Sequence, residues 1–360
     1  MTLTTEPLHV IMFPGSGNKD ENRYIDVLVQ SLRTAGVVVE SWDKHLSRQQ
    51  GNIFHVHWPQ VISDIRDREY QSLRGHWIAW QFFRTIARVK RRGGRIVWTV
   101  HDIVPHTVPL RGPAFLEKLM RRFLLAVDLA ISLTFVGIEE IKEAIPSLAT
   151  KPMCVARHPH YRGVLGPGHY DLEMRARLGI ARAQTAFAFI GSLRVNKRPD
   201  LVALAFRDLP VGEAFLVMAG SASVDMAQRI CAILSARSNV KLDILASSER
   251  IPERDVIELH AVSDIFVFPG TDYFNSGTVY TALSLSVPVI AAWSRSNEEL
   301  QNIVGRRWLH LYRGEFTRST LEEAAGALIK RDRGDTCDLS AFSPETSALE
   351  HIAAYRRALS

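Results

Sequence analysis

Short apolar runs recur along the chain and predict a series of buried strands. In the first half these runs are Leu8–Phe13, Val37–Ser41, Ile53–His57, Ile96–Val100, Leu129–Leu133 and Met153–Ala156. Helix-like stretches separate most of them, at Glu21–Ala35, His76–Arg92, Ala114–Val127 and Gly137–Ala144. Continuous apolar strands that alternate with helices are typical of parallel sheets covered on both faces, so the first half is predicted to form a doubly wound α/β domain.

The second half repeats this alternation. Its strand candidates are Ala186–Ile190, Ala214–Ala219, Val240–Ile244, Ile265–Phe268, Val287–Ala291 and Trp308–Tyr312. Its helix candidates are Pro199–Phe206, Met226–Ser235, Arg254–Ala261, Val279–Leu285 and Leu321–Lys330. A last helix-like stretch, Glu345–Leu359, is amphipathic and suited to packing on either domain. The pattern therefore predicts two α/β units of similar size in tandem.

A chain of 360 residues exceeds what one hydrophobic core usually serves, which agrees with two domains. The join is expected between Pro159 and Gln184, where glycine, histidine and turn residues gather. We expect an N-terminal Rossmann-like domain at 1–162, a C-terminal one at 163–344, and a final helix at 345–360 that is free to pack back on the N-terminal domain. Ligands of open parallel sheets bind beyond the carboxyl ends of the strands, so we expect the two domains to face a cleft.

Composition places the chain among folded soluble proteins, with 46% hydrophobic and 23% charged residues. The three cysteines are far apart and have no metal-ligand spacing, which favours a reducing, cytoplasmic compartment. We find no signal-peptide pattern and no apolar run of the roughly 20 residues that a membrane span needs. The expected location is the cytoplasm, either free or peripheral at the inner face of the cytoplasmic membrane.

The net charge of +6 favours acidic partners, and many of the basic residues lie in the first half. Arg84, Arg88 and Arg91 fall on one face of a predicted helix, with tryptophan and phenylalanine residues nearby. Such a face would suit an anionic membrane surface. The alternative is that the aromatic residues belong to the core and the arginines are simply solvated. No nucleic-acid-binding signature is present, so we expect no nucleic-acid partner.

Two cations follow the first strand of the second domain, in the segment Gly191–Pro199. Arg194 and Lys197 stand just before a predicted helix, and Gly191 permits close approach to the backbone. An arginine fork together with a lysine point charge could hold a diphosphate. A solvated basic loop is the alternative.

A second phosphate-type segment, Asn275-Ser276-Gly277-Thr278, opens another predicted helix on the same expected sheet edge. Small residues at a helix start offer backbone N–H groups and hydroxyls beside the positive end of the helix dipole, which suits an anion. An ordinary helix cap is the alternative, because asparagine and serine are common there.

Further candidate site residues follow three strands of the first half. Gly15 and Gly17 lie in a loop after the first strand, and His57 and Trp58 follow the third, where Trp58 could stack on a sugar ring. A buried Trp–His pair is the alternative. The segment T-V-H-D-x-x-P-H after the fourth strand carries three further candidates: His101, Asp102 and His106. Asp102 and His106 are side chains that could act as a general base.

These motifs together resemble the GT-B glycosyltransferases, especially the bacterial exopolysaccharide enzymes and family 4. The matching segments are G-S-L-R-x-N-K-R-P, A-V-S-D-I-F-V-F-P and S-G-T-V-x-x-A-L-S-L-S-V-P-V-I-A in the second half and T-V-H-D-x-x-P-H in the first. The resemblance implies that Arg194 and Lys197 grip the diphosphate of a nucleotide sugar and that Ser276–Thr278 donate backbone hydrogen bonds to it. It also implies that the loop Ala246–Pro252, including Ile251, meets the nucleobase, and that His101 lies beside the donor sugar.

The chain departs from family 4 in one respect. That family commonly carries two glutamates eight residues apart across the later motif, and here Tyr273 and Thr281 stand at those positions. Asp272, next to Tyr273, is a carboxylate that could take the place of one of them. The departure weakens the case for a retaining mechanism and fits the exopolysaccharide-type enzymes, in which an S-G-[ST] turn replaces the acidic pair.

The expected function is transfer of a sugar from a nucleotide-diphosphate sugar to a glycan or polyprenyl-diphosphate-linked acceptor in bacterial surface or exopolysaccharide assembly. We expect no metal and no bound cofactor, because no paired aspartates of the DxD type stand at a strand end. The alternatives are a nucleotide-sugar epimerase of the same two-domain architecture and a non-catalytic sugar-nucleotide binding subunit.

Overall fold

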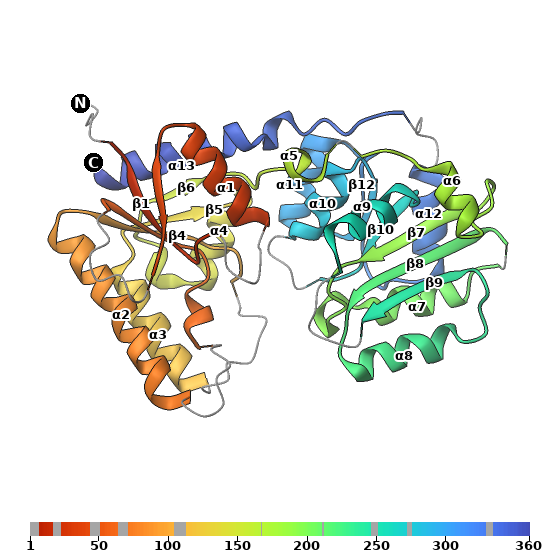
Figure 1. The fold of residues 1–360 in the computed structure, drawn as a ribbon, viewed down its shortest axis with the longest axis horizontal. Coiled ribbons are helices and arrows are strands. Elements are labelled where there is room, and N and C mark those ends of the chain that lie inside the picture. Colours follow the sequence, from red (N-terminus) through yellow and green to blue (C-terminus); the bar gives the residue numbers. More distant parts are fainter. Residues whose placement is uncertain are drawn as a thin grey trace. The chain divides into compact units, whose positions relative to one another are not determined.

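The computed structural model describes residues 7–16, 23–43, 51–63, 71–103, 113–166, 168–210, 212–245, 251–271, 276–328 and 334–360. The chain forms two compact units (Figure 1). The first unit comprises Met1–Pro159 together with Phe342–Ser360, and the second comprises His160–Ala341. The chain thus passes from the first unit to the second after Pro159 and returns to the first just before the last helix.

The first unit is built on a six-stranded sheet in which every neighbouring pair is parallel. Its strand order is β2-β1-β3-β4-β5-β6. The strands are β1 (His9–Phe13), β2 (Val38–Ser41), β3 (Ile53–Val56), β4 (Arg95–Thr99), β5 (Leu129–Ser132) and β6 (Met153–Val155). The helices are α1 (Arg23–Thr34), α2 (Gln71–Arg91), α3 (Pro113–Ala126), α4 (Phe135–Ala144) and α13 (Pro344–Leu359), with 3₁₀ turns η1 (Pro59–Ser63) and η2 (Pro146–Leu148).

The C-terminal helix α13 completes the core of the first unit. It packs along α1, and its Ala348, Ala354 and Tyr355 join the apolar cluster formed by β1, α1 and the neighbouring strands. The carboxylate of Glu350 accepts hydrogen bonds from the backbone and side chain of Arg157, which follows β6. The last residues of the chain therefore belong structurally with the first.

The second unit repeats the plan, with strand order β12-β11-β10-β7-β8-β9 and parallel pairing throughout. Its strands are β7 (Thr185–Ile190), β8 (Ala214–Ser221), β9 (Val240–Leu245), β10 (Ile265–Phe268), β11 (Val289–Ala292) and β12 (Leu309–Tyr312). Its helices are α5 (Arg162–Leu165), α6 (Leu172–Arg177), α7 (Pro199–Arg207), α8 (Val224–Leu234), α9 (Glu253–Ala261), α10 (Gly277–Ser284), α11 (Arg295–Val304) and α12 (Arg318–Leu328), with 3₁₀ turns η3 (Val195–Lys197) and η4 (Ser340–Phe342), the latter just before α13.

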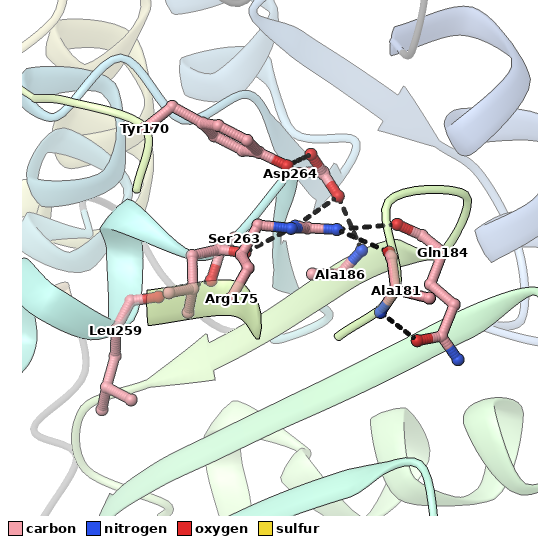
Figure 2. A network of polar contacts seen from close by, with 9 residues as sticks. Tyr170, Arg175, Ala181, Gln184, Ala186, Leu259, Ser263 and Asp264 are labelled. Carbon is pink, nitrogen blue, oxygen red and sulfur yellow. Dashed lines mark hydrogen bonds and ion pairs between the residues drawn. The ribbon is translucent and has the colours of Figure 1, made fainter. Parts of the chain in front are cut away.

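A buried ion pair fastens the amino ends of β7 and β10 to α6 (Figure 2). Arg175 of α6 is 1% exposed and lies 3.0 Å from a carboxylate oxygen of Asp264. The same oxygen accepts the backbone N–H of Ala186 at 2.8 Å, the other accepts the hydroxyl of Tyr170 at 2.8 Å, and the guanidinium also donates to the carbonyl of Gln184 at 2.9 Å. A buried charge is stable only when it is paired in this way. The network lies at the opposite end of the strands from the predicted site.

The predicted doubly wound α/β architecture is confirmed, and each apolar run proposed as a strand forms one. The alternating pattern did not reveal α11, because Arg295–Val304 is mostly polar and only three of its side chains are buried. Its start is nevertheless encoded locally, since the hydroxyl of Ser294 accepts the N–H of Asn297 and caps the helix.

Candidate functional site

Two glycines shape the carboxyl edge of the second sheet, where the donor site was predicted. Gly191 follows β7 with φ of 130°, and Gly220 lies near the end of β8 with φ of 140°. A Cβ atom on Gly220 would stand 1.7 Å from the carbonyl oxygen of Gly191, so the two strand ends approach more closely than any side chain would allow. The Gly191 loop therefore begins directly against the end of β8, where the N–H of Gly191 donates to the carbonyl of Ala219 at 2.9 Å.

The loop after Gly191 folds into the 3₁₀ turn η3, which brings Lys197 towards the start of α10. The turn ends at Arg198, whose left-handed φ of 53° reverses the chain so that Pro199 can begin α7. The ammonium nitrogen of Lys197 lies 3.3 Å from the hydroxyl of Thr278. A Cβ on Gly191 would lie 3.7 Å from the Thr278 methyl group. The two segments singled out in the sequence therefore meet at one point.

The first turn of α10 supplies the other groups of this candidate anion site. Ser276 is the N-cap residue, but its side chain makes no capping hydrogen bond to the helix. The N–H groups of Gly277 and Thr278 have no carbonyl partner within the helix, as in the first turn of any α-helix. Together with the positive end of the helix dipole and the Lys197 charge, they favour an anionic ligand.

The remaining donor candidates are only partly described. Arg194 is exposed and immediately precedes η3, and Ile251 is half-buried just before Pro252 caps α9. Asn275 lies outside the described residues, as do Asp272, Tyr273 and residues 246–250 of the predicted nucleobase loop. Thr281, which occupies one of the family 4 glutamate positions, is buried and donates its hydroxyl to the carbonyl of Gly277 at 3.0 Å.

In the first unit, His57 and His101 lie side by side after β3 and β4. Nδ1 of His57 is 3.0 Å from Nε2 of His101. The Trp58 ring stacks on His101 with 4.1 Å between centroids, and Tyr24 meets His101 edge-on at 4.7 Å. His101 is 7% exposed and His57 only 1%. Trp58 is half-buried, so the alternative of a packed Trp–His pair describes this arrangement well.

A second layer of polar aromatic side chains lies beneath this pair. His55 of β3 is hydrogen-bonded to the Thr99 hydroxyl at 2.8 Å through Nε2 and to the Tyr355 hydroxyl of α13 at 2.7 Å through Nδ1. The His351 ring lies 5.6 Å from that of His55. Burial, reinforced by neighbouring histidines, holds the pKa values of His55, His57 and His101 well below 6.5, so these imidazoles are neutral.

The other acceptor candidates of the first unit are placed as follows. A Cβ on Gly15 would lie 2.2 Å from the Ser41 side chain, so this glycine allows the loop after β1 to pack against the end of β2. Asp102 is half-buried next to His101. Gly17 and His106 lie outside the described residues.

Sequence reasoning missed the residues that support His57 and His101. His55 and His57 alternate along one strand and so share a face of the sheet, which was a usable signal. His351 and Tyr355 are four residues apart and lie on one face of α13, which was another. Nothing in the sequence pairs Tyr355 with His55, however, because 300 positions separate them. In the described part of the chain, no three histidine, cysteine or acidic side chains are arranged to hold a metal ion.

Comparisons with known proteins agree with this architecture. No protein-family model matches the chain. A curated relative, GDP-mannose:glycolipid 4-beta-D-mannosyltransferase of Xanthomonas campestris pv. campestris, is 24% identical over 292 residues, which cover 80% of this chain and 75% of that protein.

Solved structures of similar fold cover nearly the whole chain. Sucrose-phosphate synthase from Thermosynechococcus elongatus has a TM-score of 0.60 at 12% identity, covering 98% of this chain and 94% of the other. Anabaena HepE in complex with UDP has a TM-score of 0.57 at 13% identity, covering 97% and 95%. A putative UDP-N-acetylglucosamine 2-epimerase from Listeria monocytogenes has a TM-score of 0.58 at 14% identity, covering 97% and 96%.

The epimerase shares the fold, so the fold by itself does not separate the two enzyme classes considered from the sequence. The curated sequence relative is a transferase. The resemblance found in the motifs is thereby confirmed: the chain has the GT-B fold, and the curated protein to which it is related is a glycosyltransferase.

Proposed function

We propose that the protein transfers a sugar from a nucleotide-diphosphate sugar to a glycan or lipid-linked acceptor. The observation that carries the proposal is the convergence of Lys197 and Thr278, 3.3 Å apart at the start of α10. A cation, a hydroxyl and free helical amides at one point suit the two phosphates of a nucleotide sugar better than any neutral ligand. The donor is assigned to the second unit and the acceptor to the first.

Catalysis at this site rests on stabilising the leaving group. As the bond between the anomeric carbon and the diphosphate oxygen breaks, negative charge grows on the diphosphate, and Lys197 and the first turn of α10 lie ready to receive it. Arg194 adds a second cation by closing on the same phosphates. Fixed donors of this kind are each worth roughly a hundredfold or more in rate. They supply the charge that a metal would otherwise bring, so we expect transfer without a divalent ion.

The acceptor hydroxyl forms the new bond to the anomeric carbon and loses its proton. If the reaction inverts configuration, the Asp102 carboxylate takes that proton, while His101 contacts the sugar. His57 is too deeply buried to meet the acceptor itself. Trp58 contributes to the site by covering one face of His101.

The curated relative acts on GDP-mannose and a glycolipid, and HepE was solved with UDP, so the donor classes to try first are GDP-mannose and UDP-sugars. A lipid-linked acceptor would also explain why tryptophan and arginine side chains gather on one face of α2. Trp77, Trp80, Arg84, Arg88 and Arg91 follow one another at spacings of three or four residues along that helix and so share a face.

This α2 face has the composition of a bilayer-binding surface. Trp80 is 53% exposed, and Arg84 lies over its ring at 5.0 Å from the centroid. Burial, and after it the charges of Arg84, Arg92 and Arg91, lower the pKa of Arg88, which shows how densely positive charge is gathered here. Tryptophan beside arginine favours the interface of an anionic membrane.

The neighbouring helix α3 extends the face. Arg121 and Arg122 are exposed, Arg122 lies 4.1 Å from the centroid of the Phe83 ring, and Leu125 is 74% exposed. No helix in the described ranges is long and apolar enough to cross a membrane. We therefore infer peripheral attachment of this face to the inner surface of the cytoplasmic membrane, where a lipid-linked acceptor would be presented.

The function is tested by incubating the full chain with GDP-mannose or UDP-sugars and a polyprenyl-diphosphate-linked glycan, with and without EDTA. We expect sugar to appear on the lipid-linked product and the rate to be unchanged by EDTA. Release of an epimerised sugar without acceptor would support the epimerase instead. Tight nucleotide binding without turnover of any donor would support a non-catalytic subunit.

A further inference from the structure

The hydrogen bond between His57 and His101 joins two neutral imidazoles, so one ring must donate and the other accept. The bond runs from Nδ1 of His57 to Nε2 of His101 at 3.0 Å. Each ring carries one proton, because burial keeps both rings from accepting a second. Either His57 is protonated at Nδ1 and donates, or His101 is protonated at Nε2 and donates.

The other nitrogen of His57 decides between these states. Nε2 of His57 is fully buried and has no hydrogen-bond partner among the described residues. If His57 accepted at Nδ1, its proton would sit on Nε2 as a buried N–H without an acceptor. If His57 donates, Nε2 carries only an unused lone pair. Buried N–H groups without partners are rarer in proteins than incompletely satisfied acceptors, so donation by His57 is favoured.

His351 in the same cluster gives an internal precedent. Its Nδ1 lies 2.7 Å from the carbonyl oxygen of Ser347, and a carbonyl can only accept, so Nδ1 carries the proton. Its Nε2 is also buried and has no partner in the described part of the chain. The cluster therefore already tolerates a bare Nε2 lone pair in the state that we assign to His57.

We propose that His57 is a positioning residue that donates its Nδ1 proton to Nε2 of His101 and thereby fixes His101 as the tautomer protonated at Nδ1. The proposal rests on the proposed function of the site. His101 then presents an N–H donor, not a base: its Nε2 lone pair is engaged and its Nδ1 is already protonated. Nδ1 of His101 makes no hydrogen bond within the described residues, which leaves it for a hydroxyl or ring oxygen of the sugar.

The chemical consequence is a division of roles within T-V-H-D. His101 orients the sugar by hydrogen-bond donation, and proton removal from the acceptor falls to another group such as Asp102. The stack of Trp58 on His101 and the edge contact of Tyr24 hold the ring in plane for this contact. A change in tautomer would turn this donor into an acceptor without moving a heavy atom.

The tautomer is measured directly on wild-type protein labelled with ¹⁵N-histidine, using two-dimensional NMR that links the ring carbon protons to both nitrogens. The His101 signals are assigned by their loss in His101→Asn. We expect His101 to show a protonated Nδ1 and an unprotonated Nε2, and His57 to show the same pattern. A His101 ring protonated at Nε2 would overturn the proposal, whatever the enzyme's activity.

Two variants separate positioning from packing. His57→Phe keeps the ring volume but removes the donor, so His101 should lose its single tautomer and kcat should fall about tenfold, the worth of one hydrogen bond. His57→Asn places an amide donor where Nδ1 stood and should restore both the tautomer and most of kcat. Unchanged kcat in folded His57→Phe would also contradict the proposal. If no donor is ever turned over while the tautomer is as expected, the proposed function fails and the assignment of the proton stands.

Discussion

Lys197 and Thr278 are 81 positions apart in the chain and share a hydrogen bond at the edge of one sheet. The contact arises from backbone features: the Gly191 loop needs positive φ, Arg198 reverses the chain, and α10 begins where β10 has ended. Each feature fixes a position before any ligand arrives. A site prepared in this way loses little energy to reorganisation when charge develops on a leaving diphosphate.

Replacing Lys197 tests the electrostatic half of this site. Lys197→Ala should lower kcat at least a hundredfold and leave the thermal midpoint without ligand unchanged, because the side chain is partly exposed and supports no core packing. Steady-state kinetics with the working donor and a thermal melt measure the two effects. Lys142→Ala on the exposed face of α4 is the matched control. Full activity in Lys197→Ala would remove the basis of the assignment.

Replacing Thr278 tests the hydroxyl separately from its shape. Thr278→Val keeps the methyl group that faces Gly191 and removes only the oxygen that Lys197 contacts. We expect a loss of about tenfold in kcat/KM, equivalent to one hydrogen bond. Thr278→Ser should retain most of the activity. A double variant with Lys197→Ala should lose less than the two single changes combined, because the residues act on one phosphate group.

At the level of single residues, the sequence was most informative where the residues of a candidate site are neighbours in the chain. The cations of Gly191–Pro199 and the small residues of Ser276–Thr278 are contiguous, and each follows a strand that periodicity identifies. The contact that supports His57 and His101 could not be predicted, because it brings His55 of β3 together with His351 and Tyr355 of α13, about 300 positions further along the chain. Burial of polar side chains depends on tertiary packing, which a single sequence does not specify.

At the level of elements, α2 has two roles: one side belongs to the core of the first unit, and the other forms the surface at which we propose that a lipid-linked acceptor is presented. One side of the helix packs Phe82 into the core and the other exposes tryptophan and arginine. The aromatic residues therefore divide: the phenylalanines are core residues and the tryptophans are not, while contact with a membrane stays a proposal. Helix spacing already separates them, because Trp77 and Trp80 share the face of Arg84 whereas Phe82 and Phe83 do not, but the sequence interpretation treated the four aromatic residues as one group.

Charge reversal on α2 tests attachment to a membrane. Arg84→Glu, Arg88→Glu and Arg91→Glu together should abolish co-sedimentation with vesicles that contain anionic lipid, while binding to neutral vesicles stays low in both proteins. Each arginine near an anionic surface is worth about 1 kcal/mol, so three reversals change binding by several powers of ten. The control is the same change at Arg177, Arg182 and Arg306, which are exposed in the second unit. Equal loss in both triple variants would show an effect of net charge only.

At the level of the whole molecule, two units of the same plan differ in what their carboxyl edges carry. The second unit gathers cations and hydroxyls, and the first gathers neutral histidines and aromatic rings. Sequence periodicity predicted both sheets, because buried parallel strands are recognisable locally. The contrast in polarity came from the residues that follow the strands, because Arg194, Lys197 and Ser276–Thr278 lie in the second half and His57, Trp58 and His101 in the first.

The free energy of unfolding of the first unit should depend on pH through its buried histidines. Burial lowers the pKa values of His158 and His351 to about 4, and those of His55, His57 and His101 well below 6.5. Below pH 6.5 these histidines bind protons in the unfolded chain but stay neutral in the folded unit. The free energy of unfolding must therefore fall as the pH decreases from 6.5 towards 4. Above pH 6.5 these histidines are neutral in both the folded and the unfolded state, so their full contribution to stability is present.

Each such histidine adds about 1.4 kcal/mol per pH unit to the slope within that window. Urea unfolding followed by tryptophan fluorescence reports mainly on the first unit, which holds five of the seven tryptophans. His351→Leu removes one buried titrating ring and should make the slope shallower by one such increment. The matched control variant is His169→Leu, at an exposed position in the second unit. A free energy of unfolding that stays level between pH 7.5 and 5 would mean that the cluster is open to protons in the folded state.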